Sequence, residues 1–185
     1  KNIVRKFFDE TVDPSGHGAI DFMLHDFGFR GASSVESAGI GGMAHLVNFK
    51  GTDTLAGMQY ARKYYNASLS GLAYSVPASE HSVMTSDHHG EEHVLSRLLD
   101  NYKSGILSVV ADSYDIYNFV SSFMLNYKDR ILSRDGVFVV RPDSVTSLHK
   151  TPADQVVWIC KELHKIFGAT KNNLGYYEIN PNHKK

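Results

Sequence analysis

The 185-residue sequence predicts an α/β fold of about five parallel βα units. Short apolar runs, rich in β-branched and aromatic residues, alternate with stretches that have helical spacing. The apolar runs are continuous, which is typical of parallel strands buried on both faces. Strands that alternate with helices in this way indicate βαβ units around a parallel sheet.

The predicted elements follow one another along the chain. The strands are IDFML (20–24), AHLVNF (44–49), LAYSV (72–76), ILSVVA (106–111) and GVFVV (136–140). Helices are predicted over 52–65, 91–102, 113–125 and 151–167. Thr52 or Asp53 can cap the first helix, and Thr151 followed by Pro152 gives the last one a favourable start. Residues 168–185 are predicted to be a loop-like tail.

The composition excludes several classes of protein. The 19 Lys and Arg residues nearly balance the 20 Asp and Glu residues, so the basic face of a nucleic-acid binder is not expected. No apolar run reaches the roughly 18 residues of a transmembrane helix, and the first residues do not form a signal peptide. The single Cys160 excludes an intramolecular disulfide and suits a reducing compartment. We therefore expect a cytoplasmic protein with no membrane or nucleic-acid partner.

A polar or charged cluster follows each predicted strand. The clusters are HDFGFRG (25–31), KGTD (50–53), PASEHS (77–82), DSYD (112–115) and RPDS (141–144). Parallel α/β folds bind their ligands at the carboxyl ends of the strands. Five clusters at equivalent positions therefore indicate an active site.

The cations and carboxylates in these clusters suit a phosphorylated sugar. Arg30 and Arg141 can each hold a phosphate or carboxylate group through a planar guanidinium. Asp112, Asp115 and Asp143 can accept hydrogen bonds from sugar hydroxyls or bind hydrated Mg²⁺.

The aromatic residues suit a ligand with a heteroaromatic base, and the histidine suits a step that transfers a proton or a phosphoryl group. Phe27 and Phe29 can offer a flat face to a planar ring. Histidine is the side chain whose unperturbed pKa lies near neutrality, so His81, next to Glu80, can act as an acid, a base or a phosphoryl acceptor.

Simpler interpretations stay open for five residues. Asp112 and Asp53 can cap the helices that follow them. Phe29 can be a core residue, Arg30 can form a surface ion pair, and His81 can be structural.

A rival motif, HGEEH (89–93), has the spacing of a zinc hydrolase motif, with His89 and His93 one helical turn apart. Gly90 weakens a helix at this place, and no third ligand is evident nearby. Acidic residues in a first turn suit the helix dipole. A solvated helix start is the better interpretation, and no metal ligand is assigned.

Taken together, LHDFGFRG, AGIGG…AHLVNFKGTDT, YSVPASEHS, DSYDIYN and RPDS resemble the nicotinamide phosphoribosyltransferase family in order and spacing. The resemblance runs from about residue 18 to 180. It implies an irregular α/β barrel of the type II phosphoribosyltransferases, usually a homodimer. It also implies the reaction of nicotinamide with phosphoribosyl pyrophosphate, which yields nicotinamide mononucleotide and pyrophosphate.

The resemblance implies a role for each substrate-binding residue. Phe27 would stack on the nicotinamide ring, and Asp53 would accept a hydrogen bond from the carboxamide. Arg30 and Arg141 would hold phosphate or orient the ring, and Ser75 would line the base pocket. Independently of the resemblance, an Asp53 carboxylate accepts from an amide but repels the carboxylate of nicotinate, which predicts nicotinamide as the substrate.

The resemblance also implies the catalytic groups. His81 would be the histidine that the family phosphorylates from ATP, here an activator, with Glu80 and Asp112 orienting it. Asp143 would bind ribose hydroxyls, and Mg²⁺ would accompany the pyrophosphate.

Family members are much longer than this chain. We therefore expect residues 1–185 to form a partial barrel domain without the family's N-terminal region and C-terminal phosphate loops, with little turnover alone. Residues 144–150, SVTSLHK, depart from the family's glycine-containing run, which puts ligand contacts there in doubt. Two alternatives remain: an inactive module that needs complementary chains, and a relative that uses nicotinate.

Overall fold

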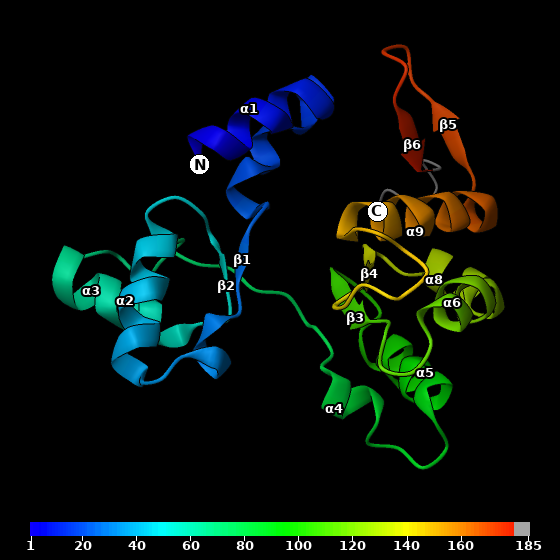
Figure 1. The fold of residues 1–185 in the computed structure, drawn as a ribbon, viewed down its shortest axis with the longest axis horizontal. Helices are drawn as coiled ribbons and strands as arrows, with labels where there is room; N and C mark the ends of the chain where they lie inside the picture. The colour runs from blue at the N-terminus through cyan, green and yellow to red at the C-terminus, as the bar shows by residue number, and fades with distance from the viewer. Residues whose placement is uncertain (180–185) are drawn as a thin grey trace. The chain divides into compact units, whose positions relative to one another are not determined.

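A computed structural model describes residues 1–179 of the chain. It divides into two compact units, Lys1–Ser75 and Val76–Lys185 (Figure 1). Each unit contains helices and at least one pair of parallel strands, which confirms the predicted α/β class. Whether the chain forms one partial barrel domain stays a prediction.

The N-terminal unit is built around two short parallel strands. His25 pairs with Gly51 and Asp26 with Thr52, and a parallel bridge joins Gly51 to Tyr74. The elements of this unit are α1 (Asn2–Thr11), η1 (Pro14–Phe22), β1 (His25–Asp26), η2 (Gly28–Gly31), α2 (Val35–Leu46), β2 (Gly51–Thr52) and α3 (Leu55–Tyr65).

Helices α2 and α3 flank β2 in the sequence and pack closely on each other. An added Cβ on Gly57 would lie 2.7 Å from the carbonyl carbon of Gly42, and one on Gly42 would lie 3.0 Å from the Cα of Gly57. These glycines therefore let the two backbones approach as near neighbours. The hydroxyl of Ser34 caps α2 by accepting from the Ser37 N–H at 3.0 Å.

The C-terminal unit is built around a longer parallel pair, β3 and β4. Leu107 pairs with Phe138 and Val110 with Arg141, and a parallel bridge joins Ala78 to Ser108. The elements of this unit are α4 (His81–Met84), α5 (Glu91–Asn101), β3 (Leu107–Val110), α6 (Ile116–Asn118), the π-helical η3 (Phe119–Phe123), α7 (Met124–Asn126), α8 (Lys128–Leu132), β4 (Phe138–Arg141), α9 (Pro152–Phe167), β5 (Ala169–Lys171) and β6 (Tyr177–Ile179).

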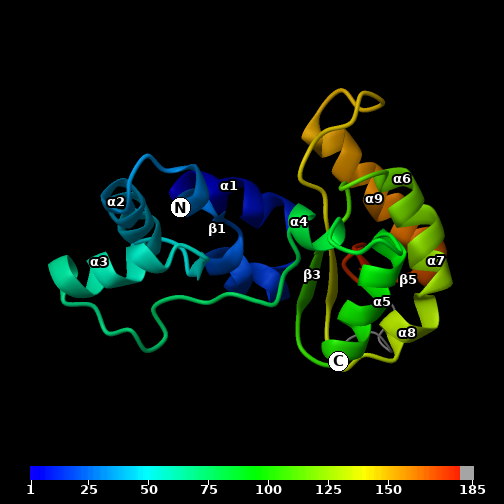
Figure 2. The same cartoon turned by 90° about the horizontal axis from the view of Figure 1, so that it is seen from below.

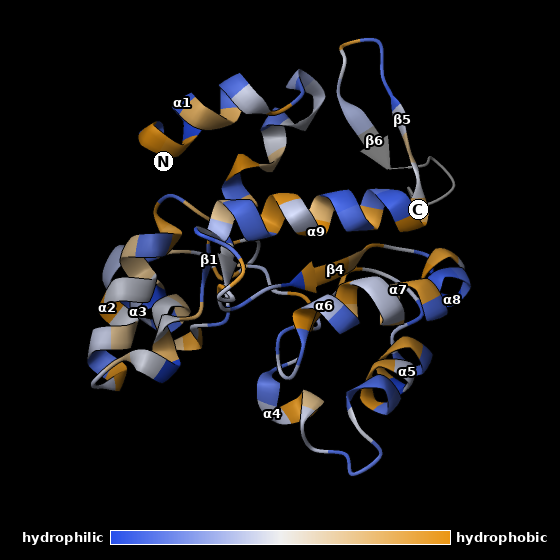
Figure 3. Cartoon of the chain, turned by 45° about the vertical axis from the view of Figure 1, so that its right-hand side comes forward, coloured by the Kyte–Doolittle hydropathy of each residue, from blue (hydrophilic) through white to orange (hydrophobic). Residues whose placement is uncertain are grey.

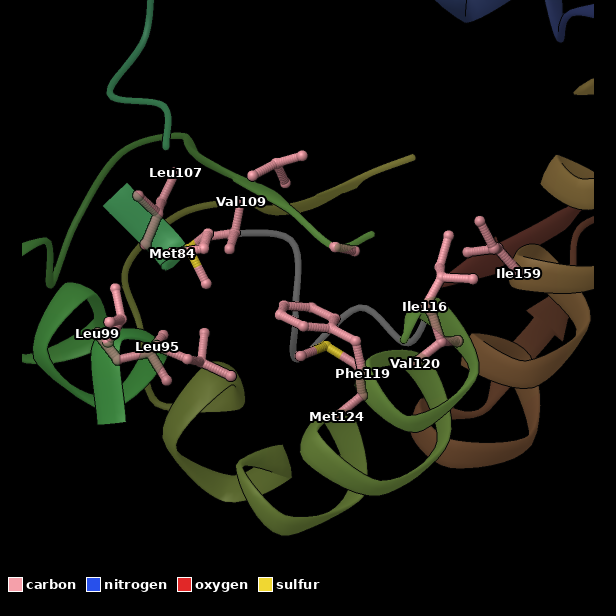
Figure 4. Close-up of a cluster of buried hydrophobic side chains, with 13 residues drawn as sticks. Met84, Leu95, Leu99, Leu107, Val109, Ile116, Phe119, Val120, Met124 and Ile159 are labelled. Carbon is pink, nitrogen blue, oxygen red and sulfur yellow. The ribbon is translucent and has the colours of Figure 1, made fainter. Parts of the chain in front are cut away.

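The core of this unit lies around β3, whose four residues are all buried. In Figure 2, α5, α6 and α7 lie on one side of β3. Figure 4 shows Leu95 of α5, Val109 of β3, Phe119, Met124 and Ile159 of α9 in one cluster. Replacing a fully buried phenylalanine such as Phe119 by alanine typically costs about 3–5 kcal/mol. The residues around β3 thus hold in place the loops at its carboxyl end.

Helix α9 starts as the sequence predicts. The hydroxyl of Thr151 accepts from the Asp154 N–H at 3.2 Å, the Asp154 carboxylate accepts from the Thr151 N–H at 3.0 Å, and Pro152 is the first helical residue. The predicted helix over 91–102 is confirmed as α5, and the one over 113–125 forms as α6, η3 and α7. No helix in the described part of the chain is long and apolar enough to cross a membrane.

Three of the five strand predictions are wrong in position. Residues 20–22 end the 3-10 helix η1, and 44–46 end α2, so β1 and β2 begin only at His25 and Gly51. In 72–76, only Tyr74 makes a bridge. Periodicity cannot separate a short apolar strand from a buried helix turn, which explains these errors. The last two strands are confirmed as β3 and β4 with shifted ends.

Other differences concern segments without a clear pattern. Helices α1, α2 and α8 were not predicted, and Thr54, rather than Thr52 or Asp53, precedes α3 as its N-cap residue. The predicted loop-like tail contains an antiparallel hairpin, in which Lys171 pairs with Tyr177. Residues 180–185 of that tail lie outside the described residues.

Candidate active site

The residues predicted to form the site fall into two groups, one in each unit. The N-terminal unit contains Phe27, Arg30, Asp53 and Ser75, and the C-terminal unit contains Glu80, His81, Asp112, Arg141 and Asp143. In both units, these residues follow or end extended segments that pair in parallel. This agrees with the placement expected at strand ends.

Asp53 follows β2 and forms the centre of the N-terminal group. Its Oδ1 accepts a hydrogen bond from the Ser75 hydroxyl and lies 3.1 Å from Nε2 of His25 in β1. Its backbone N–H donates to the Asp26 carbonyl at 2.9 Å, which extends the β1–β2 pairing. Thr54 occupies the N-cap position of α3, so the interpretation of Asp53 as a helix cap is wrong.

Phe27 and Arg30 lie in the turn that follows β1. The ring centroid of Phe27 is 4.6 Å from that of His25, and Cζ of Arg30 lies 5.6 Å from the Phe27 centroid. The Gly28 N–H donates to Oδ1 of Asp26 at 2.7 Å, and an added Cβ on Gly28 would lie only 2.9 Å from that oxygen. The tight turn places an aromatic ring beside a guanidinium, a combination that suits a planar ligand or an anion.

His81 begins α4 and lies among side chains from two other segments of the C-terminal unit. Nδ1 is 3.1 Å from Oγ of Ser113, and Nε2 is 3.1 Å from Oδ2 of Asp143. Nε2 also lies 3.8 Å from Oδ1 of Asp112. The side chain is 41% exposed, so a ligand can reach the imidazole.

The hydrogen bonds of His81 assign its neutral tautomer. An ionised carboxylate only accepts, so the Nε2–H donates to Asp143, and Nδ1 keeps the lone pair that accepts from Ser113. The His81 hydrogen bond, followed by the charge of Arg141, lowers the pKa of the Asp143 carboxyl below its ordinary value. Nη1 of Arg141 donates to Oδ1 of Asp143 at 2.7 Å. Asp143 is therefore an anion held between two donors.

Asp112 anchors the chain that follows β4. Its Oδ2 accepts from the backbone N–H groups of Asp143 at 3.0 Å and Ser144 at 2.6 Å. Its side chain is only 6% exposed, and within residues 1–179 its buried Oδ1 has no hydrogen-bond partner. These contacts, rather than helix capping, account for Asp112, so the capping interpretation is wrong. The unpaired oxygen is a position that hydrated Mg²⁺ can satisfy.

Some cluster residues have roles that the sequence left open or missed. Asp115 caps α6, since its Oδ1 accepts from backbone N–H groups of that helix. Phe29 is exposed, so it is not a core residue. Ser113 was missed, although its place inside DSYD beside Asp112 was a signal. Glu80 precedes α4, and its role in orienting the histidine stays a prediction.

Glu91, at the start of α5, is a buried carboxyl that sequence reasoning treated as part of a solvated helix start. The residue is 6% exposed, and its Oε1 has no hydrogen-bond partner in the described part of the chain. Burial, together with the charges of Asp112 and Asp115, raises the pKa of Glu91 to about 7. Glu91 and Asp115 line a cavity of about 680 Å³ beside α4.

We expect the variant Glu91→Gln to be more stable than the parent above pH 7. The folded-state pKa lies above the ordinary value of 4.5, so folding takes up a proton, and the free energy of unfolding falls as pH rises from 4.5 to 7. The amide removes this penalty, which is worth about 1–3 kcal/mol. Urea unfolding at pH 5 and pH 8 measures it, with Glu92→Gln as the matched control. Equal stability changes at both pH values would contradict the assignment.

The histidines of HGEEH have a third polar group beside them. Oδ1 of Asp87 accepts from Nδ1 of His89 at 3.0 Å, and its Oδ2 lies 2.9 Å from Nδ1 of His93. The expectation that no third ligand lies nearby is therefore wrong.

The chain is similar to known proteins over nearly its whole length. The sequence profile of the Nicotinate phosphoribosyltransferase (NAPRTase) family matches residues 22–183. The chain is 40% identical over 190 residues to a nicotinamide phosphoribosyltransferase of Xanthomonas campestris pv. campestris, covering 97% of this chain and 38% of the relative. A protein of the same name from Mycoplasma pneumoniae is 33% identical, covering 97% of this chain and 39% of the relative.

A third relative has the same name and is also matched over only part of its length. The nicotinamide phosphoribosyltransferase of Acinetobacter baylyi is 35% identical over 176 residues, covering 82% of this chain and 33% of the relative. The chain thus spans well under half the length of the curated relatives that it matches. Because the family profile covers nearly the whole sequence, the chain belongs to the nicotinate phosphoribosyltransferase family.

Proposed function

We propose that this chain is part of a nicotinamide phosphoribosyltransferase that serves NAD salvage. The enzyme joins nicotinamide to phosphoribosyl pyrophosphate and releases nicotinamide mononucleotide and pyrophosphate. The observation that carries the proposal is the cluster of His81, Ser113, Asp112, Arg141 and Asp143 at the carboxyl ends of β3 and β4. The names of the relatives support the choice of reaction.

The transfer reaction needs positioning more than acid–base chemistry. The pyridine nitrogen already has a lone pair, which forms a bond to the anomeric carbon as the bond to pyrophosphate breaks. Pyrophosphate leaves with the bonding electrons, through an oxocarbenium-like state. Phe27 would stack on the ring, Arg30 and Arg141 would hold phosphate or orient the ring, and Asp143 would bind the ribose.

Mg²⁺ is the cofactor that we propose to accompany the pyrophosphate. The donor set fits, because the buried Oδ1 of Asp112 lacks a hydrogen bond within the described residues and the Asp143 carboxylate lies beside the same histidine. Mg²⁺ prefers one or two carboxylates together with substrate phosphates. When bound, it would neutralise charge on the leaving pyrophosphate.

ATP is the proposed activator, and His81 is the proposed phosphoryl acceptor. The attacking nitrogen must be unprotonated. The hydrogen bond to Asp143 keeps the proton on Nε2, so the Nδ1 lone pair of His81 is available once the Ser113 hydroxyl moves away. The nitrogen would form a bond to the γ-phosphorus as ADP leaves with the electrons of the broken bond. Asp112 would then hold the loop that keeps Asp143 in position.

We further propose that these units belong to an irregular α/β barrel, in a cytoplasmic homodimer. The barrel is supported by parallel pairing: β1 pairs with β2, β3 pairs with β4, and the bridges at Tyr74 and Ala78 are parallel as well. The homodimer is what the family resemblance implies. Parallel pairs with crossover helices are the building units of such barrels.

An assay for nicotinamide mononucleotide tests the proposal. We expect little product from the chain alone, because a barrel needs more strands, and product after fusion to the flanking segments of the Xanthomonas relative. Product from the isolated chain would show that the remainder is not needed. A folded fusion that makes no product from nicotinamide would contradict the proposed reaction, leaving the alternatives of a nicotinate enzyme and an inactive module.

A further inference from the structure

A histidine-rich cluster spans the loop between α4 and α5 and the first turn of α5, and it shares no residue with the groups described for the transfer reaction. Figure 3 shows this loop as hydrophilic. One ligand atom each from Asp87, His89 and His93 lies within 4.8 Å of the other two. The loop follows directly on the short helix that begins with His81.

The carboxylate of Asp87 organises this cluster. Its side chain is 8% exposed, and Oδ1 accepts from the backbone N–H of His89 at 2.9 Å as well as from Nδ1. The rings of His89 and His93 have centroids 4.9 Å apart, and both turn Nδ1 toward the carboxylate.

We propose that Asp87, His89 and His93 bind one divalent transition-metal ion of the Zn²⁺ or Ni²⁺ class. Two imidazoles and a carboxylate suit these ions, whereas Mg²⁺ and Ca²⁺ prefer oxygen ligands alone. Three protein ligands leave the remaining positions to water. Binding replaces the Nδ1 protons, which move to Nε2 in a neutral ring and are released from a charged one.

A bound ion would tie the loop to the first turn of α5. His89 and Asp87 lie before the helix, and His93 lies within it. The ion therefore fastens the segment that connects His81 to α5, at a place distinct from the proposed Mg²⁺ position at Asp112. This differs from a zinc hydrolase, because the proposed ion has a structural role.

Arg97 competes for the same carboxylate. Its Nη1 lies 3.3 Å from Oδ2 of Asp87, and its side chain is 65% exposed, so it can swing into solvent when an ion binds. Removing this cation should strengthen metal binding, because the Asp87 carboxylate then has no competing partner at Arg97. If the cluster were only a network of ion pairs, the same substitution would weaken the network and would raise no metal affinity. Arg97→Ala thus separates a metal site from a surface salt bridge.

Calorimetric titration of the untagged chain with Zn²⁺, Ni²⁺ and Mg²⁺ tests the proposal. A Cys160→Ser background removes the exposed thiol, a competing zinc ligand. We expect one Zn²⁺ or Ni²⁺ per chain and no Mg²⁺ at this position. His89→Ala and His93→Ala should each weaken binding about 100-fold or more, since the loss of an outer partner alone costs about 10–100-fold.

The control variants make the result decisive. His164→Ala, which removes an exposed histidine on α9, should leave the affinity unchanged, and Arg97→Ala should raise it. Absence of 1:1 binding, or equal losses for His164→Ala and His93→Ala, would overturn the proposal. If the histidine variants fail to fold, X-ray absorption spectroscopy of the zinc-loaded parent protein identifies the ligands instead. Zinc ligation without two imidazoles would exclude this site.

Discussion

We expect the variant His81→Ala to lose all stimulation of the transfer reaction by ATP. The imidazole is the only group in this cluster that we propose to accept a phosphoryl group, and alanine offers no nucleophile. The rate with ATP divided by the rate without it should therefore fall to about 1. The measurement uses the chain completed with the flanking segments of the Xanthomonas relative, at saturating nicotinamide.

Two companion measurements separate chemistry from loss of structure. Transfer of ³²P from the γ-position of ATP should label the parent protein in an acid-labile, base-stable form and should not label His81→Ala. Ser113→Ala keeps the imidazole and removes one of its contacts, so it should still be labelled. Full ATP stimulation of a folded His81→Ala protein would rule out the assigned role.

The second large effect that we expect is a loss of base selectivity in Asp53→Asn. The Asp53 carboxylate can accept from the carboxamide of nicotinamide but repels the carboxylate of nicotinate. At about 4 Å and an intermediate effective dielectric, that repulsion amounts to a few kcal/mol. The ratio of kcat/KM for nicotinamide to that for nicotinate should fall by about 100-fold.

Ser75→Ala is the matched control for this prediction. Its hydroxyl donates to the Asp53 carboxylate, so the substitution removes a contact and keeps the charge. Both substrates should then be affected to a similar extent. A folded Asp53→Asn enzyme with an unchanged ratio would contradict the assignment and would favour another residue as the source of selectivity.

The part of the fold that sequence reasoning predicted well is the part with strong local signals. Thr151, Pro152 and Asp154 specify the start of α9 through contacts within four residues, so propensity and structure agree. The run around Leu107 is long enough to be recognised as a buried strand. The segments 20–24 and 44–49 failed because their apolar residues end helices, and only contacts with other segments decide that outcome.

The site followed the same division. Placing polar residues after strands was enough to predict that Asp112, Arg141 and Asp143 lie close together, because the carboxyl ends of parallel strands converge. It could not show that Asp112 acts through backbone N–H groups, or that Ser113 contacts His81, since both depend on the three-dimensional path of the chain. The burial of Glu91 was missed because the pattern of polar and apolar residues around it is that of an exposed helix start.

The close approach of α2 and α3 has a consequence for reading sequence profiles of this family. A methyl group on Gly57 would lie 2.7 Å from the backbone of Gly42, and one on Gly42 would lie 3.0 Å from the Cα of Gly57, so either would press the two helices apart. Helix α3 begins just after Asp53, so any separation of the helices would displace that carboxylate. We therefore expect larger residues to be poorly tolerated at both positions, because the two helices pack so closely there. Conservation of glycine at these positions would follow from the close approach of the two backbones, and it would not be evidence for a binding role.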